Sequence, residues 1–192
     1  YLFEADVGAM AAEAGTSFEM EGRSVRYEAF ERVAAEENCS KIAVAQNMND
    51  QCETLLMRLF RGTGLKGLGG IRPVREGRII RPLLEVSRAE IEAYCCAHGL
   101  VPRMDPTNAQ PAYVRNRIRL EVLPYLETHF NPQVIQCLSR TAAVLREDEA
   151  LLERVTLEAL EARRLTSKGS GVEEGCGMEL NGFETLEPAL QK

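Results

Sequence analysis

The spacing of apolar positions predicts helices and one short strand in the N-terminal third of the chain. Thr16-Ser-Phe-Glu19 has the form of a capping box, and apolar residues between positions 23 and 37 recur at the spacing of one helical face. Ser40-Lys-Ile-Ala-Val-Ala45 is apolar on both sides, which is typical of a buried strand in a parallel sheet. A second helix is expected next, capped by Asn49 or Asp50. Helix, strand and helix in this order indicate the α/β class.

The pattern becomes glycine-rich and then helical further along the chain. Residues 61–70 contain five glycines, which predicts a loop whose backbone takes positive φ or approaches another group closely. Ile79-Ile80 is a strand candidate, and Ser87-Arg-Ala-Glu90 is a capping box that opens a helix ending at Gly99. Asp105-Pro-Thr-Asn108 indicates a turn, and residues 113–126 indicate a helix with a proline near its end.

The C-terminal third is expected to hold one long helix and then a linker. Asn131-Pro132 predicts an N-cap followed by proline at the first position of an amphipathic helix that runs to about Arg164. Residues 167–171 and the glycine-rich residues after them indicate a linker, followed by a strand candidate at Met178-Glu-Leu180. A last helix is expected from Thr185. Because the chain starts at Tyr1 without Met and stops inside that helix, we expect a segment cut at both ends.

Composition is that of an ordinary folded protein, but the charge is unevenly distributed. Of the 192 residues, 45% are hydrophobic and 27% charged, no stretch reaches the ~18 apolar residues of a membrane span, and no signal peptide opens the chain. The net charge is −6, yet residues 58–88 hold eight basic and two acidic side chains, whereas residues 1–57 hold four basic and eleven acidic ones. This local excess suits a polyphosphate such as nucleic acid, and a solvated basic face is the alternative.

The six cysteines, at positions 39, 52, 95, 96, 137 and 176, include no CxxC pair. The usual spacing of a structural zinc site is therefore missing, and we expect no metal site. We expect reduced, buried cysteines of a cytoplasmic protein, with a disulfide framework as the alternative.

Two carboxylates lie at the start of the helix that follows the expected strand, where α/β proteins bind ligands. Asp50 and Glu53 are three residues apart and therefore share one helical face. Such a pair can hold Mg²⁺, accept a proton or attract an ammonium group. The alternative is local, with Asp50 capping the helix and Glu53 completing its capping box.

Arginines lead into the glycine-rich loop and recur in the later helix. Arg58 and Arg61 beside exposed backbone amides suit phosphate binding, although no Gly-Lys-Ser/Thr follows, and a flexible surface loop is the alternative. In residues 113–119, Arg115 and Arg119 share a face and Arg117 points elsewhere. Three arginines in five residues indicate a bound anion or, alternatively, ion pairs with the acidic N-terminal half.

Taken in order, these segments resemble the bacterial tRNA(Ile)-lysidine synthetases, which are enzymes of the PP-loop ATP pyrophosphatase type. Residues 49–71, from Asn-Asp-Gln-Cys-Glu-Thr to Gly-Leu-Lys-Gly-Leu-Gly-Gly-Ile, are similar to the signature of that family. Other matching segments follow its order and spacing. They are Arg23-Ser-Val-Arg-Tyr27, Arg81-Pro-Leu-Leu84, Ser87-Arg-Ala-Glu-Ile-Glu92, Asp105-Pro-Thr-Asn108 and Arg115-Asn-Arg-Ile-Arg119. The resemblance is strong over residues 5–126.

The resemblance implies a fold as well as an activity. We expect an α/β protein with a partial parallel-sheet, Rossmann-like domain of the adenine nucleotide alpha hydrolase-like type, followed by a mostly helical second domain. Residues 1–126 are then the later half of the nucleotide-binding domain, residues 127–166 the helical domain, and residues 167–192 a linker and the start of a further segment. Strand 41–45 is expected to be central, with helix 50–60 at its carboxyl end.

Members of the family are ligases that join free lysine to the wobble cytidine of the tRNA(Ile) anticodon. The cytosine carbonyl oxygen is first adenylated by ATP, and the lysine amine then displaces AMP. The resemblance therefore implies tRNA(Ile), free lysine and ATP with Mg²⁺ as partners in the cytoplasm, and it leaves a homodimer open. By resemblance, the expected catalytic residues, which should converge on one cleft, are Asp50, Glu53, Arg23 and Arg117. The expected ATP-binding residues, in the RGxG loop of the family, are Arg61, Gly62 and Gly64.

The chain departs from the family pattern in two places. The ATP loop of the family, Ser-Gly-Gly-x-Asp-Ser, precedes the matched residues and does not occur in this sequence, so we expect the segment alone to bind ATP poorly and not to turn over. Gln46 stands where the family usually has His, and Gln cannot act as an acid or base near pH 7. Two alternatives follow: a non-catalytic RNA-binding remnant, or another PP-loop tRNA-modifying enzyme such as one that thiolates cytidine.

Overall fold

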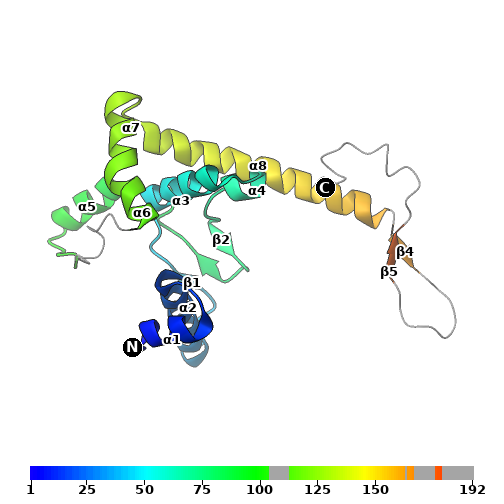
Figure 1. Ribbon diagram of the computed structural model, residues 1–192, viewed down its shortest axis with the longest axis horizontal. Helices are drawn as coiled ribbons and strands as arrows, with labels where there is room; N and C mark the ends of the chain where they lie inside the picture. Colours follow the sequence, from blue (N-terminus) through cyan, green and yellow to red (C-terminus); the bar gives the residue numbers. More distant parts are fainter. Residues whose placement is uncertain (104–112, 163, 167–175, 179–192) are drawn as a thin grey trace. The chain divides into compact units, whose positions relative to one another are not determined.

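The computed structural model describes residues 1–103, 113–162, 164–166 and 176–178, the last two ranges by their backbone alone (Figure 1). The chain divides into two compact units. Unit 1 is formed by residues 1–47 and 72–94, and unit 2 by residues 48–71 and 95–192. Within the described ranges, no helix is both long and apolar enough to cross a membrane.

Unit 1 begins with two helices, α1 (Val7–Ala14) and α2 (Phe18–Glu36). Helix α1 was not predicted. It starts where the Asp6 carboxylate accepts a hydrogen bond from the Ala9 amide at 3.0 Å. The cap of α2 is Ser17, one residue after the predicted Thr16, and its hydroxyl accepts a hydrogen bond from the Met20 amide at 3.2 Å. For α2, the sequence therefore predicted the right type of capping residue but placed it one residue too early.

The sheet of unit 1 contains β1 (Ile42–Ala43), β2 (Val74–Arg75) and β3 (Ile79–Ile80) in the order β1-β3-β2. Strand β1 pairs with β3 in parallel, as predicted, whereas β2 pairs with β3 antiparallel, so the sheet is mixed. The prediction of a central strand at 41–45 is wrong for this sheet, because β3 occupies the middle and β1 an edge. Nor is β1 apolar and buried on both faces, since Ala43 is exposed.

The β2–β3 hairpin was missed because its turn carries an unusual residue. Glu76 and Gly77 both have positive φ, at 53° and 64°, and the Arg78 amide donates to the Arg75 carbonyl at 3.1 Å. Two positive φ angles in a two-residue turn are the type I′ geometry that joins tightly twisted strands. The core of unit 1 then forms where α2 packs on the sheet through Ala34, Ile42 and Ile79.

Unit 2 is helical. Its helices are α3 (Met48–Arg61), α4 (Leu65–Leu68), α6 (Val114–Arg117), α7 (Leu123–His129) and α8 (Val134–Glu161), with a π-helical turn, η2 (Ile118–Val122), between α6 and α7. Helix α5 (Arg88–Ala97) crosses the boundary between the units. Its Ser87 capping box is confirmed, because the Glu90 amide donates to the Ser87 hydroxyl at 3.2 Å and the Ser87 amide to the Glu90 carboxylate at 2.8 Å.

Several helix boundaries of unit 2 differ from the prediction. Helix α3 begins at Met48, so Asp50 lies in its first turn and is not its cap. The helix expected to end at 126 runs to His129, and Pro124 lies at the start of α7. Proline has no amide hydrogen, and its ring crowds the carbonyl four residues earlier. The helix widens before Pro124, where the Leu123 amide donates to the Ile118 carbonyl, five residues away, and not to the carbonyl four residues away.

Helix α8 lies alongside α3 and α4 (Figure 1). It starts at Val134, two residues later than predicted, because the Asn131 carboxamide oxygen accepts from the Gln133 amide at 2.9 Å in a turn that precedes the helix. A buried cluster of Cys52, Leu56, Ile118, Leu123 and Ile135 joins α3, η2, α7 and α8. After α8, β4 (Arg164–Thr166) and β5 (Cys176–Met178) pair antiparallel. Strand β4 was not expected, and β5 ends at Met178, where the strand candidate was expected to begin.

The turn expected at 105–108, the linker expected at 167–171 and the helix expected from Thr185 lie outside the described residues, as do residues 179 and 180 of the strand candidate. The cysteines are free, as expected for the reduced state, in the part of the chain that the structure describes. Their predicted burial is right only for Cys52, because Cys95 is half-buried and the other three in this part are exposed. Those three are Cys39, Cys96 and Cys137.

Candidate functional site

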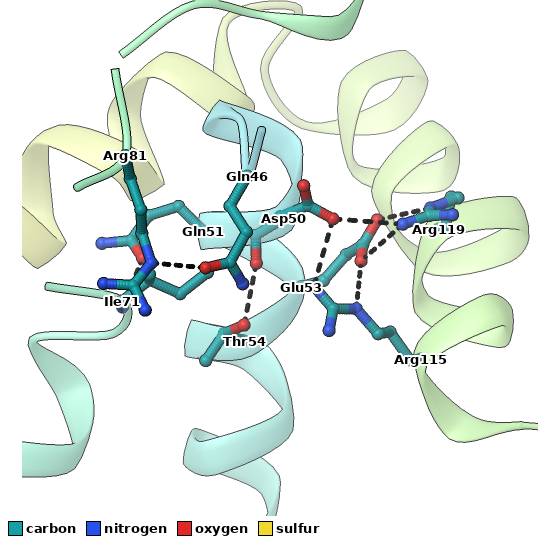
Figure 2. A network of polar contacts seen from close by, with 9 residues as sticks. All are labelled: Gln46, Asp50, Gln51, Glu53, Thr54, Ile71, Arg81, Arg115 and Arg119. Carbon is teal, nitrogen blue, oxygen red and sulfur yellow. Dashed lines mark hydrogen bonds and ion pairs between the residues drawn. The ribbon is translucent and has the colours of Figure 1, made fainter. Parts of the chain in front are cut away.

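The two predicted carboxylates of α3 face two arginines of the later helix (Figure 2). Glu53 is fully buried, at 0% exposure. Its Oε2 accepts from Arg115 Nε at 2.7 Å, and its Oε1 accepts from Arg119 Nε at 2.6 Å. Asp50 Oδ1 lies 3.1 Å from Arg115 Nη2 and 3.3 Å from Arg119 Nη2. Two anions and two cations therefore form one neutral cluster inside unit 2.

Helical spacing produces this cluster from both sides. Asp50 and Glu53 are one turn apart on α3, and Arg115 and Arg119 are one turn apart on α6 and η2, so each pair presents its charges along one face. The hydrogen bond to Glu53, together with the charges of Glu53 and Asp50, raises the pKa of the Arg119 guanidinium. The alternative in which Asp50 and Glu53 serve only as a capping box is wrong, because both carboxylates bind guanidinium groups 62 to 69 residues away.

The structure separates the three arginines of residues 115–119. Arg115 and Arg119 form ion pairs with the acidic N-terminal half, which was the alternative to a bound anion. Arg117, the one matched to the catalytic set by resemblance, is exposed, and its Nε lies 4.0 Å from Glu121 on the same helical stretch. The shared face of Arg115 and Arg119 was visible in the sequence, but their partners were not.

The fourth predicted catalytic residue, Arg23, belongs to unit 1. Its guanidinium carbon lies 5.0 Å from the centre of the Tyr27 ring, and that of Arg75 lies 4.9 Å from the same centre. An aromatic ring face stabilises cations at such distances. Arg23 and the carboxylates belong to different units, so their convergence on one cleft stays a prediction.

Gln46 of unit 1 has a structural partner. Its carboxamide oxygen accepts a hydrogen bond from Nε of Arg81 (Figure 2), which is only 7% exposed, and Arg81 Nη1 donates to the Arg72 carbonyl at 2.5 Å. A buried guanidinium needs acceptors for its donors. Gln46 therefore provides an acceptor that stays uncharged at every pH, whereas a histidine at this position would accept only in its neutral form.

The glycine-rich residues 62–71, which we call the glycine segment, are not a plain loop, because they include α4. Arg61 is exposed at the end of α3, Gly62 has φ of +75°, and Gly64 is the N-cap of α4. Two side chains of α3, Arg58 and Gln51, bond to the backbone that follows. Arg58 Nη1 donates to the carbonyls of Gly67 at 2.9 Å and Gly70 at 2.8 Å, while Gln51 accepts from the Ile71 amide at 2.6 Å and donates to the Gly69 carbonyl at 3.3 Å.

A Mg²⁺ site at Asp50 and Glu53 does not fit this arrangement. Both oxygens of Glu53 and Oδ1 of Asp50 lie against guanidinium groups, which repel a divalent cation and occupy the oxygens that would bind it. Among the residues with described side chains, no group of three or more His, Cys, Asp or Glu could hold a metal ion.

The amino-acid sequence of this chain is similar to those of known proteins. A family model described as a PP-loop domain matches residues 3–126, which include the carboxylate–arginine cluster. The chain is 44% identical over 153 residues to a tRNA(Ile)-lysidine synthase of Clostridium tetani, covering 80% of this chain and 33% of the relative. It is 48% identical over 178 residues to one of Symbiobacterium thermophilum, covering 91% and 34%. The chain thus spans about a third of the length of these relatives.

Proposed function

Because this chain belongs to the PP-loop family and has tRNA(Ile)-lysidine synthases among its relatives, we propose that its parent protein joins free lysine to the wobble cytidine of tRNA(Ile) with ATP. The observation that carries the proposal is the similarity to such synthases over 80% to 91% of this chain, at 44% to 48% identity. The matched residues 3–126 include every residue to which this subsection assigns a role in the reaction.

The reaction proposed for the parent protein has two steps. The cytosine carbonyl oxygen attacks the α-phosphorus of ATP and pyrophosphate leaves. The lysine amine then attacks the ring carbon that carries this oxygen. AMP leaves with the oxygen, and the amine gives up its proton. Residues 1–126 are proposed as the later half of the nucleotide-binding domain and residues 127–166 as a helical domain.

The geometry supports different roles for the two carboxylates. The Asp50 side chain is 19% exposed and that of Glu53 is 0% exposed, so Asp50 is the one that a lysine ammonium can reach. Glu53, held by both arginines, fixes the positions of Arg115 and Arg119. Such fixed charges act without reorganisation when the charge of the reacting groups changes.

The exposed cations are proposed to meet the phosphates. Arg61 with Gly62 and Gly64 is proposed to contact ATP, and Arg23 and Arg117 to neutralise charge on ATP or on the RNA backbone. Mg²⁺ is proposed to arrive bound to ATP, since the carboxylates of the cluster already have cationic partners.

The test is lysine incorporation by the full-length protein. Purified protein is incubated with tRNA(Ile), ATP and labelled lysine, and label in the tRNA is counted. Glu53→Ala and Asp50→Asn should abolish incorporation, whereas Glu158→Gln, which alters an exposed pair with Arg154 on α8, should leave it unchanged. A folded wild-type protein that binds tRNA without incorporating lysine would contradict the proposal and indicate the RNA-binding alternative. Incorporation of sulfur in place of lysine would indicate the thiolating alternative.

A further inference from the structure

The glycine segment is held from a second side by α8, a helix far away in the sequence. Arg146 lies on α8, 77 residues after Gly69. Its Nη1 donates to the Gly69 carbonyl at 2.8 Å and lies 3.4 Å from the Ile71 carbonyl. Because guanidinium donors carry charge, these bonds are stronger than those between neutral groups.

The backbone of the segment lies so close to α8 that it leaves no room for a side chain. A Cβ atom on Gly69 would lie 2.6 Å from Cγ of Arg146 and 3.6 Å from its Cα. This close approach explains a glycine at position 69, where φ is an ordinary −59° and nothing in the backbone requires one. Glycine here is a requirement of packing against Arg146.

Charged side chains add a second, weaker link between α4 and α8. Lys66 Nζ lies 4.0 Å from Glu149 and 3.8 Å from Glu153. Lys66 is 74% exposed, so these pairs contribute little to stability. They do favour the same placement of α4 along α8 that Arg146 enforces.

The residues with proposed roles for ATP lie immediately before this anchored stretch. Gly62 is four residues and Gly64 two residues before Lys66, and Arg61 ends α3. The backbone between Arg61 and Gly69 therefore has fixed ends, one in α3 and one at Gly69, whose carbonyl is bound by Arg146. Between them, Arg58 binds the Gly67 carbonyl.

We infer that Arg146 is a positioning residue for the proposed reaction, since by holding the Gly69 and Ile71 carbonyls it fixes the glycine segment against α8 and thereby places Arg61, Gly62 and Gly64 for ATP. The inference rests on the proposed function for its kinetic part. Arg146 itself contacts only backbone of the segment in these bonds, so it acts on the nucleotide through the residues that it holds.

The first measurement tests whether Arg146 holds the segment. Amide hydrogen exchange is compared in the full-length protein and its Arg146→Ala variant. Exchange in peptides that cover residues 62–71 should become at least tenfold faster, while peptides of α7 should stay unchanged. The matched control is Arg154→Ala, which removes an exposed arginine of the same helix whose partner is Glu158 on α8. The control should exchange like the wild type.

The second measurement tests positioning with steady-state kinetics of lysidine formation. Arg146→Ala should raise the KM for ATP about tenfold, the scale of one lost charged hydrogen bond, with less than a threefold change in kcat. Arg146→Lys should recover part of the ATP affinity, because an ammonium group can still donate to one carbonyl. Arg154→Ala should keep the wild-type KM.

The outcomes separate this inference from the function on which it rests. Unchanged exchange at residues 62–71 in Arg146→Ala, or an unchanged KM for ATP, would overturn the inference. A wild-type protein that forms no lysidine would overturn the proposed function instead, and the exchange measurement would still decide whether Arg146 holds the segment.

Discussion

Glu53 is a buried anion whose burial depends on two cationic neighbours. At 0% exposure it has lost its hydration, and hydrogen bonds of 2.6 to 3.0 Å from Arg115 and Arg119 replace it. Removing one member of such a group leaves the opposite charges without a partner, which costs about 3–5 kcal/mol. Asp50, which is 19% exposed, keeps contact with water and its loss costs less.

We therefore expect Glu53→Gln to lower the free energy of unfolding of the 192-residue chain by about 3 kcal/mol, and Asp50→Asn by less than about 1 kcal/mol. Urea unfolding followed by circular dichroism measures both values. Equal effects of the two substitutions would contradict the view that Glu53 holds the cluster together. Loss of lysidine formation in Asp50→Asn at nearly native stability would then assign Asp50 a direct role.

The buried thiol of Cys52 makes the folded protein less stable at alkaline pH. Burial, and next the charge of the neighbouring Glu53, raises the pKa of its thiol from 9.0 to about 12. Between these values the unfolded thiol loses its proton while the native one keeps it, so the free energy of unfolding decreases as the pH rises from 9 towards 12. At pH 10.5 this loss amounts to about 2 kcal/mol.

The corresponding measurement compares urea unfolding at pH 8 and pH 10.5 in the wild type and in Cys52→Ala. Because the two proteins differ only at position 52, the difference between their losses isolates Cys52. The wild type should lose about 2 kcal/mol more than Cys52→Ala over this interval. Parallel losses would show that Cys52 ionises normally in the native protein.

At the scale of elements, the glycine segment depends on two glycines for different reasons. Gly62 and Gly70 both have positive φ, at +75° and +65°. A Cβ on Gly62 would meet nothing within 4 Å, whereas one on Gly70 would lie 2.6 Å from the Gln51 carboxamide. Backbone strain alone costs about 1 kcal/mol, and the clash would also displace the buried Gln51 and its hydrogen bonds.

We expect Gly62→Ala to destabilise the chain by about 1 kcal/mol and Gly70→Ala by about 3 kcal/mol. Thermal and urea unfolding of the two variants provide the comparison, and each serves as the other's control because φ is nearly the same. If both cost the same, Gln51 is not the constraint at this position.

The same elements show how far sequence reasoning extends. The Ser87 capping box and the parallel pairing of β1 were predicted because local chemistry and a short apolar run determine them. The start of α3 and the turn before α8 were wrong by two residues, because polar side chains near a helix start offer several competing caps. The π-helical turn at 118–122 depends on how the chain accommodates Pro124, and the spacing of apolar residues does not indicate such a turn.

The site was predictable by residue type but not by partner. The sequence indicated that the carboxylates at 50 and 53 share one helical face, and that the arginines at 115 and 119 share another. Their pairing spans 62 to 69 residues and depends on tertiary packing, so the sequence did not indicate it. The role of Arg146 had no sequence signal at all, because its partners are backbone carbonyls.

At the scale of the whole molecule, the structure changes which arginines are available to RNA. The sequence predicts that the basic residues of 58–88 and 115–119 bind RNA. Arg58, Arg115 and Arg119 donate to groups of the protein itself, whereas Arg61 is exposed at the end of α3. A guanidinium that neutralises a carboxylate releases few counterions from RNA.

We expect the 192-residue chain to bind single-stranded RNA weakly, with an affinity that falls as salt rises. Arg61→Ala should reduce the slope of log K against log salt by about 0.7, the value of one phosphate contact, and Arg119→Ala should leave the slope unchanged. Fluorescence anisotropy across a salt series measures both slopes. A reduced slope in Arg119→Ala would show that RNA competes successfully with Glu53 for that arginine.

Helix α8 is long, and the buried Ala142 lies much closer to Arg146 than to the end of the helix at Glu161. Ala142 is fully buried, and the helix extends four residues from there to Arg146 and nineteen to Glu161, which correspond to about 6 Å and about 28 Å. For a helix that rocks about Ala142, a displacement of about 5 Å at the Glu161 end becomes about 1 Å at Arg146. That is enough to stretch the 2.8 Å bond to Gly69 beyond hydrogen-bonding distance. A movement of the Glu161 end of α8 would thus be reduced about fivefold at Arg146, and would break its hydrogen bond to the Gly69 carbonyl.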